Sequence, residues 1–180
     1  MEVPFAAVLA YKSRNINETC IYEGKTDFFK KQYEELQRFY QQRIECDLPI
    51  YCCSITNDIT TIKKRNSRNF ACGGGINIFA VTDNGNIYSC EHLAFDEKYA
   101  VGNIASGIDK KVLESMQPDD VNSILECSNC WIRFFCSAGC FSEKMLIGRA
   151  SKSLPKEECT LKRIYCGMAF FLFVRKVERN

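Results

Sequence analysis

The feature that most constrains this chain is a run of four cysteines within fourteen residues. They are separated by two, five and three residues, at Cys127, Cys130, Cys136 and Cys140. Two thiolates at the first of these spacings can converge on one metal centre from a single turn, and the small residues at 137–139 let backbone approach an inorganic core closely. The run therefore predicts a soft-metal or iron-sulfur site.

Three further cysteines lie where a partner set of ligands is needed. Cys72 opens a Cys-Gly-Gly-Gly stretch, Cys90 ends a predicted hairpin, and Cys159 follows the run. Seven thiols in this arrangement suit two clusters better than one.

The chain carries twelve cysteines in 180 residues, which indicates either disulfides or metal. Its first residues lack the basic region and the long apolar core of a secretory signal, so we expect a cytoplasmic protein. A reducing cytoplasm favours thiolate ligation over disulfides. The net charge of +2 gives no overall field that would attract nucleic acid or an anionic membrane, and neither is an expected partner.

The first third of the chain predicts strand, helix and strand, which is one unit of a parallel α/β layer. Val3–Tyr11 and Pro49–Ile55 are apolar runs of strand length. Between them an amphipathic helix starts near Thr26 or Asp27, either of which could be its N-cap. Its apolar residues recur at steps of four and three, at Phe29, Tyr33, Leu36, Tyr40 and Ile44.

Residues 59–70 predict a connecting loop whose basic side chains are solvated, with a patch for an acidic peptide as the alternative. These side chains belong to Lys63, Lys64, Arg65 and Arg68. Cys52 and Cys53, on the second strand, are better explained by core packing than by ligation.

A β-hairpin is predicted over 76–90, with its turn at Asp83-Asn84-Gly85-Asn86. Its strands run out and back, which brings Cys72 and Cys90 to the same end. Further along, 101–104 predicts a turn or short strand, and 118–120 can start a helix that leads into Cys127. Ser142–Ser153 predicts a loop, and Cys159–Val174 an apolar helix shorter than the roughly 20 residues of a membrane span.

The full pattern is Cys72-x12-Gly85-x4-Cys90, then Cys127-x2-Cys130-x5-Cys136-x3-Cys140, then Cys159. It resembles the SPASM domain of radical S-adenosylmethionine enzymes, a C-terminal extension that carries auxiliary 4Fe-4S clusters. The resemblance covers about residues 68–175 and includes the turn Val101-Gly-Asn-Ile104. Among these enzymes the chain is most similar to the maturases that build thioether crosslinks or related modifications on ribosomally made peptides.

The resemblance implies an α+β fold in two parts. Residues 67–180 would form the SPASM domain, a small cysteine-rich two-cluster domain with a β-hairpin and a C-terminal helix. Residues 1–66 would form the strand-helix end of a partial α/β barrel, the C-terminal part of the radical enzyme's catalytic barrel.

The chain departs from the family pattern at three points. Ser89-Cys90-Glu91-His92 replaces the common Pro-Cys-His, and Ala138 replaces the first glycine of Gly-Gly-Cys; both changes are tolerable. The chain also lacks the C-x3-C-x2-C triad that holds the cluster on which S-adenosylmethionine is cleaved. This chain alone is therefore not expected to perform radical chemistry. S-adenosylmethionine would bind only through a missing or separate barrel, in cis or in trans.

The resemblance also implies which thiols hold which cluster. The first auxiliary cluster would be held by Cys72, Cys90 and Cys140. The second would be held by Cys127, Cys130, Cys136 and Cys159. Two-cluster ferredoxins likewise send the last cysteine of a tight run to the other cluster.

The fourth ligand of the first cluster stays open between several groups. Solvent, a small thiol or a cysteine of the substrate could bind the remaining iron; the protein candidates are His92, Cys52, Cys53 and Cys166. Four residues within the run are expected to pack around the clusters and limit solvent access, namely Trp131, Arg133, Phe134 and Phe135.

The expected function is that of a cluster-binding module of a peptide-modifying enzyme, which anchors a peptide or protein substrate and transfers electrons. Two alternatives remain. One is a stand-alone iron-sulfur electron carrier or peptide-binding partner protein. The other is structural zinc, because a Cys-x2-Cys step with two later thiols also suits a tetrahedral zinc site.

Overall fold

The computed structural model describes residues 24–94, 96–146 and 156–179. The chain divides into two compact units, Met1–Ser67 with Pro155–Asn180 and Arg68–Leu154, here called the helical unit and the cysteine-rich unit. Their first boundary lies one residue from the expected one between 66 and 67. The C-terminal segment, expected with the cysteine-rich part, groups with the helical unit instead.

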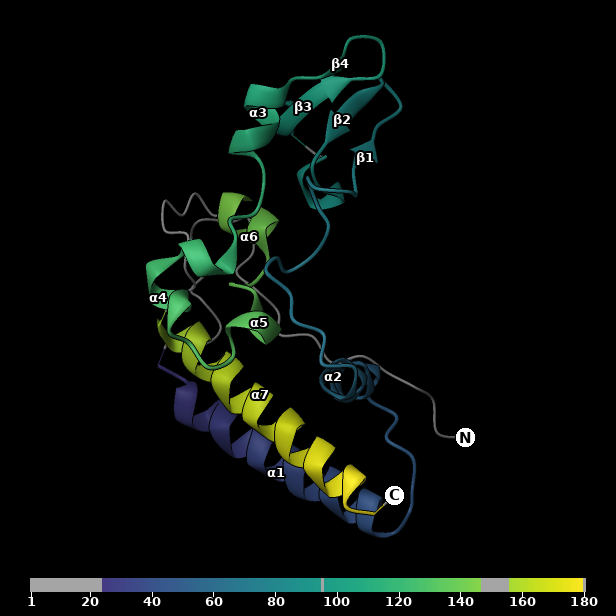
Figure 1. Cartoon of the computed structure of the whole chain (residues 1–180), viewed down its shortest axis with the longest axis vertical. Helices are drawn as coiled ribbons and strands as arrows, with labels where there is room; N and C mark the ends of the chain where they lie inside the picture. Colours follow the sequence, from purple (N-terminus) through teal and green to yellow (C-terminus); the bar gives the residue numbers. More distant parts are fainter. Residues whose placement is uncertain (1–23, 95, 147–155, 180) are drawn as a thin grey trace. The chain divides into compact units, whose positions relative to one another are not determined.

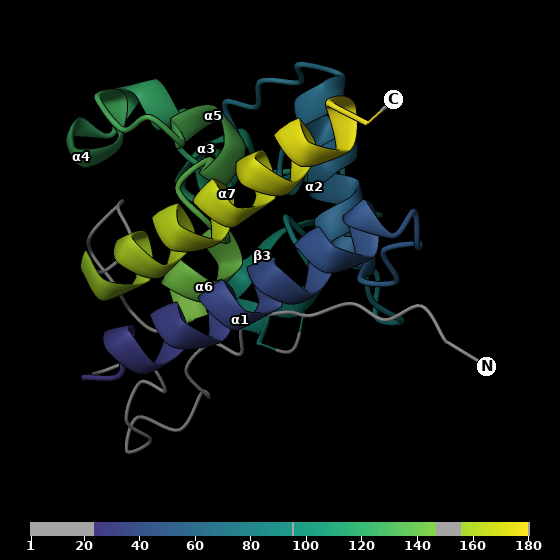
Figure 2. The same ribbon diagram turned by 90° about the horizontal axis from the view of Figure 1, so that it is seen from below.

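The helical unit contains α1 (Thr26–Glu45), α2 (Cys53–Lys63) and α7 (Lys156–Val177). Figures 1 and 2 show α1 and α7 side by side and running in the same direction. Two contacts join the pair: the rings of Tyr33 and Tyr165 lie 5.7 Å apart along the helices, and Arg179 donates to the carbonyl of Ile44 at 2.8 Å near their C-terminal ends. The shared core consists of Tyr40, Ile44, Cys52, Ile55, Ile59, Met168 and Leu172.

Helix α1 confirms the amphipathic helix predicted from the sequence. Tyr40 and Ile44 are buried, and Tyr33 and Leu36 pack partly against the same core. The predicted N-cap is wrong, because the helix begins after Lys25 without a side-chain cap. Helix α7 likewise confirms the predicted C-terminal helix, and within the described residues no helix has the length and apolarity needed to cross a bilayer.

The strand predicted over 49–55 is wrong, because 49–51 are irregular, Cys52 forms only an isolated bridge, and α2 begins at Cys53. Ile55 and Ile59, four residues apart, are both buried on one helix face. The hydroxyl of Thr56 donates to the carbonyl of Cys52 at 3.3 Å, so the helix backbone satisfies this polar side chain. A short apolar run does not by itself distinguish a strand from a buried helix.

Helix α2 also replaces the first part of the predicted loop over 59–70, whereas residues 64–68 are exposed as expected of a linker. The first predicted strand, Val3–Tyr11, lies outside the described residues. The described regular elements of this unit are therefore helices, and the expected strand-helix-strand order is not found among them.

The cysteine-rich unit contains one antiparallel sheet in the order β1-β2-β3-β4. Its strands are β1 (Ala80–Val81), β2 (Asn86–Tyr88), β3 (Ala100–Asn103) and β4 (Gly107–Ile108). The predicted hairpin is confirmed, with Val81 opposite Ile87 and a positive φ of 81° at Gly85 in the turn. Its first strand is shorter than predicted because 75–77 form a turn, and β3 confirms the short strand expected at 101–104.

Short helices are the other regular elements described in this unit. They are η1 (Glu91–Leu93), η2 (Glu97–Tyr99), α3 (Lys110–Ser115), η3 (Val121–Ser123), α4 (Leu125–Ser128), α5 (Arg133–Cys136) and α6 (Phe141–Leu146). The helix start predicted at 118–120 is confirmed, since the Asp120 carboxylate accepts from the backbone of Asn122.

Helix α6 contradicts the loop predicted from Ser142, and the rest of that loop lies outside the described residues. Phe141 is buried, and Met145 and Leu146 pack against the same cluster one turn later. The polar residues between them concealed this one-sided apolar pattern in the sequence.

The apolar core of the cysteine-rich unit is divided into two small clusters. One consists of Tyr88, Leu93, Tyr99 and Phe141, and the other of Val121, Ile124 and Ala138. The class is α+β, with a small antiparallel sheet, many cysteines and a C-terminal helix elsewhere in the chain. Such small clusters suggest that the unit gains stability from something other than apolar burial.

A buried polar pair joins α2 to α7 in the helical unit. The Tyr165 hydroxyl donates to Asp58 at 2.5 Å. Burial, and next this hydrogen bond, raise the pKa of Tyr165 above its ordinary value of 10.0. The folded protein therefore holds this proton at a pH where the unfolded chain releases it.

The free energy of unfolding should consequently fall as the pH rises above 10, by about 1.4 kcal/mol per pH unit for this one group. Below pH 10 both states keep the proton, so this contribution is fully present there. Tyr165→Phe should remove that part of the slope, as measured by urea unfolding on either side of pH 10. Equal slopes in the two proteins would contradict the assignment.

Candidate metal centre

Two cysteines of the first predicted ligand set lie on either side of Gly74. A Cβ atom added at Gly74 would lie 3.4 Å from the Sγ of Cys72 and 3.9 Å from the Cβ of Cys90. The backbone N–H of Gly74 donates to the Cys72 sulfur at 3.4 Å. Both cysteines thus lie near one glycine, where an added side chain would contact them.

The third cysteine of this set is brought in by helix packing. Cys140 directly precedes α6 and Cys90 directly precedes η1, and these two helices contact each other. Phe141 belongs to the apolar cluster against which Cys90 also packs. The Cys140 thiol is hydrogen-bonded to the Ser142 hydroxyl at 3.1 Å. The segments that carry the three thiols therefore meet within one unit.

The second predicted set is built from two tight turns and a left-handed bend. The backbone N–H of Cys130 donates to the carbonyl of Cys127 at 2.8 Å, and that of Arg133 to the carbonyl of Cys130 at 3.1 Å. Beyond Cys136, the φ angles at positions 137, 138 and 139 are 51°, 60° and 76°. Left-handed conformations at Ser and Ala are strained and tend to cluster at functional sites.

Two thiols of the second set act electrostatically on a third. Burial, and then the thiols of Cys136 and Cys130, raise the pKa of Cys127, while Lys144 acts in the opposite direction. Cys127 is therefore a neutral thiol in the metal-free protein. Metal binding at this site would release its proton, so metal affinity would depend on pH.

Lys144 was not found by sequence reasoning, because it lay in a predicted loop. Burial lowers the pKa of its ammonium group, and Asp119 followed by Cys127, Cys140 and Cys136 opposes that lowering. This half-buried cation therefore lies near thiols of both predicted sets. Its position one helical turn after Cys140 is the signal that could have identified it.

Of the other predicted ligands, the four cysteines belong to the helical unit, and His92 belongs to the cysteine-rich unit. Cys159 is half-buried in the first turn of α7, in the helical unit. His92 lies in η1, with its side chain 63% exposed and its Nε2 atom 3.9 Å from a carboxylate oxygen of Glu91. Cys52 and Cys166 are buried in the helical unit, and Cys53 begins α2.

The residues expected to pack around the clusters differ in exposure. Trp131 is 60% exposed, whereas Phe134 packs against the cluster of Val121, Ile124 and Ala138. Within the described ranges, no three His, Cys, Asp or Glu side chains stand at the mutual distances of a single-ion site.

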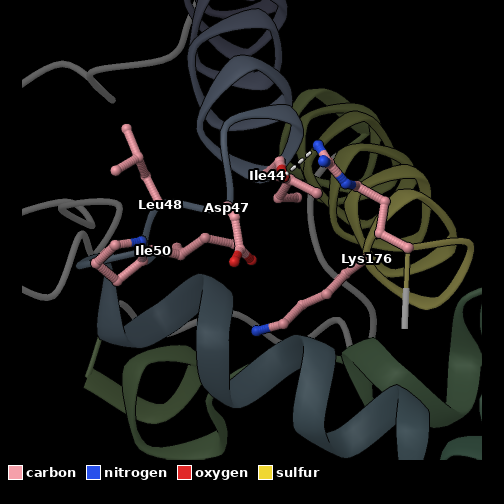
Figure 3. A pocket seen from close by; sticks show the side chains of 7 residues that line it. Ile44, Asp47, Leu48, Ile50 and Lys176 are labelled. Atoms are coloured by element: carbon pink, nitrogen blue, oxygen red, sulfur yellow. Dashed lines mark hydrogen bonds between the residues drawn. The ribbon is translucent and has the colours of Figure 1, made fainter.

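A separate pocket lies at the C-terminal ends of α1 and α7, with a volume of about 420 Å³. Figure 3 shows the carboxylate of Asp47 and the ammonium of Lys176 extending into it beside Leu48 and Ile50. None of its charged lining residues was singled out in the sequence. The pocket has no thiol and is not part of the candidate metal centre.

Comparison of the sequence with models of protein families and with curated proteins found no match.

Proposed function

We propose that this chain is an auxiliary iron-sulfur module of the SPASM type from a radical S-adenosylmethionine enzyme that modifies peptides. The observation that supports it best is the grouping of thiols in the cysteine-rich unit. Cys72, Cys90 and Cys140 sit on segments that meet, and Cys130 and Cys136 both act electrostatically on Cys127.

The cysteine-rich unit fits the proposed clusters in three respects. Gly74 supplies an N–H donor to a ligand sulfur and has no side chain to press on the two cysteines beside it. The cations of Arg133 and Lys144 are half-buried near the thiols, which suits the negative charge of thiolate-bound clusters. The two small apolar clusters leave the unit in need of a further stabilising element.

When bound, the clusters would supply single-electron transfer, and an iron without a protein ligand could bind a substrate thiolate. Cys72, Cys90 and Cys140 would hold the first cluster. Cys159 would complete the set of Cys127, Cys130 and Cys136 for the second. The partners would be a cytoplasmic peptide or protein substrate and a radical S-adenosylmethionine barrel in cis or in trans.

Anaerobic reconstitution with iron and sulfide tests this proposal. The full chain should bind about eight iron and about eight sulfide ions, because two four-iron clusters are proposed. Iron and acid-labile sulfide assays measure the content, and electron paramagnetic resonance of the reduced protein identifies the cluster type. Stoichiometric zinc without sulfide would support a structural zinc protein and contradict the proposal.

A further inference from the structure

Arg133 is a half-buried arginine at the first position of α5, inside the cysteine run. Its Nη1 atom donates to the carbonyl of Cys130 at 3.4 Å, and its guanidinium carbon lies 4.4 Å from the ring centroid of Phe134. Its Nε atom is buried and has no hydrogen-bond acceptor among the described residues. One strong donor of a charged group thus has no acceptor among the residues that the structure describes.

No carboxylate pairs with Arg133 in the described parts of the chain. A guanidinium keeps its positive charge at any pH at which the protein is folded. A partly buried charge without a partner is unfavourable, as is a buried donor without an acceptor. The position of Arg133 therefore calls for an anion that the described residues do not supply.

The contacts of Arg133 relate it to the three cysteines of the second set that lie in the cysteine run. It is bonded to the backbone of Cys130, and it shares the single turn of α5 with Cys136. Phe134, on which its guanidinium lies, packs together with Cys127 against one apolar cluster. The guanidinium is thus held beside the place where these three thiolates would carry an anionic cluster.

We propose that Arg133 is a positioning residue, whose guanidinium donates to the sulfur atoms of a bound cluster. That cluster is the one held by Cys127, Cys130 and Cys136, so the inference rests on the proposed function. Hydrogen bonds to sulfur and nearby positive charge stabilise the reduced, more negative cluster and so raise its reduction potential. The guanidinium holds several N–H donors in one rigid plane. It can therefore donate to several sulfur atoms at once, which suits it better to this site than the compact ammonium of a lysine.

The test compares Arg133→Met, Arg133→Lys and Arg68→Met in the reconstituted full chain. Arg68 is the matched control, because it donates to the carbonyl of Phe135 in the same helix at 3.1 Å but is exposed. Arg133→Met should make the midpoint potential of one cluster more negative and release its iron to a chelator on the order of 10- to 100-fold faster. Arg133→Lys should give an intermediate shift, and Arg68→Met should behave as wild type.

Comparing the metal-free proteins distinguishes a positioning role of Arg133 from a purely structural one. Metal-free Arg133→Met should be at least as stable to urea as metal-free wild type, because it loses an uncompensated charge. If Arg133→Met loads both clusters with unchanged potentials, or cannot fold without metal, the inference is wrong while the proposed function stands. If wild type takes up no iron-sulfur cluster, both are overturned.

Discussion

Cys130→Ala should lose about half of the iron of the reconstituted chain, because one of two four-iron clusters would lack a ligand. Cys130 interacts with Cys127 and lies in a tight turn with it, so the remaining thiols of that set cannot readily replace it. The first set, built around Gly74, should keep its cluster. Iron and sulfide assays and the spectrum of the remaining cluster measure this.

Cys46→Ala is the matched control, since Cys46 is an exposed cysteine at the end of α1. It should retain all of the iron. Cys159→Ala should lose the same amount as Cys130→Ala if Cys159 completes the second set. Equal iron loss from Cys46→Ala and Cys130→Ala would show that the ligand assignment is wrong.

Leu172→Ala should lower the free energy of unfolding of the helical unit by about 2–5 kcal/mol. Leu172 is fully buried on α7 and belongs to the core shared with α1 and α2. Truncation there removes apolar contacts and leaves a cavity between α7 and the two helices that pack against it. Urea unfolding followed by far-ultraviolet circular dichroism measures the change.

Val174 provides a control on the same helix, because it is 48% exposed. Val174→Ala should change the stability by no more than about 0.5 kcal/mol. If both substitutions cost the same, the packing of α7 described for this unit would be wrong.

The sequence predicted the elements whose periodicity extends over several turns or is fixed by turn chemistry. Helix α1 shows this in the burial of Tyr40 and Ile44, and the hairpin in the positive φ of Gly85. It failed where an apolar run was short, as at α2, or was interrupted by polar residues, as at α6. In those places the tertiary contacts of Ile55 and Phe141 decide the structure, and local pattern does not reveal them.

The candidate site was predictable to a similar extent. Cysteine spacing identifies the thiols, because ligand type and separation are visible in the sequence. The half-buried position of Lys144 and the unsatisfied Nε atom of Arg133 depend on packing between segments. The strained conformation of Ala138 was equally hidden, because alanine alone does not indicate a left-handed backbone.

The helical unit is discontinuous, since the cysteine-rich unit lies between α2 and α7 in the sequence. During synthesis the ribosome therefore releases α1 and α2 well before the helix that completes their core. Until α7 emerges, Tyr40, Ile44 and Ile55 lack the partners Met168 and Leu172 that cover them in the folded state. Folding of this unit must await a contact distant in the sequence, and meanwhile its apolar surface is open to chaperones and proteases.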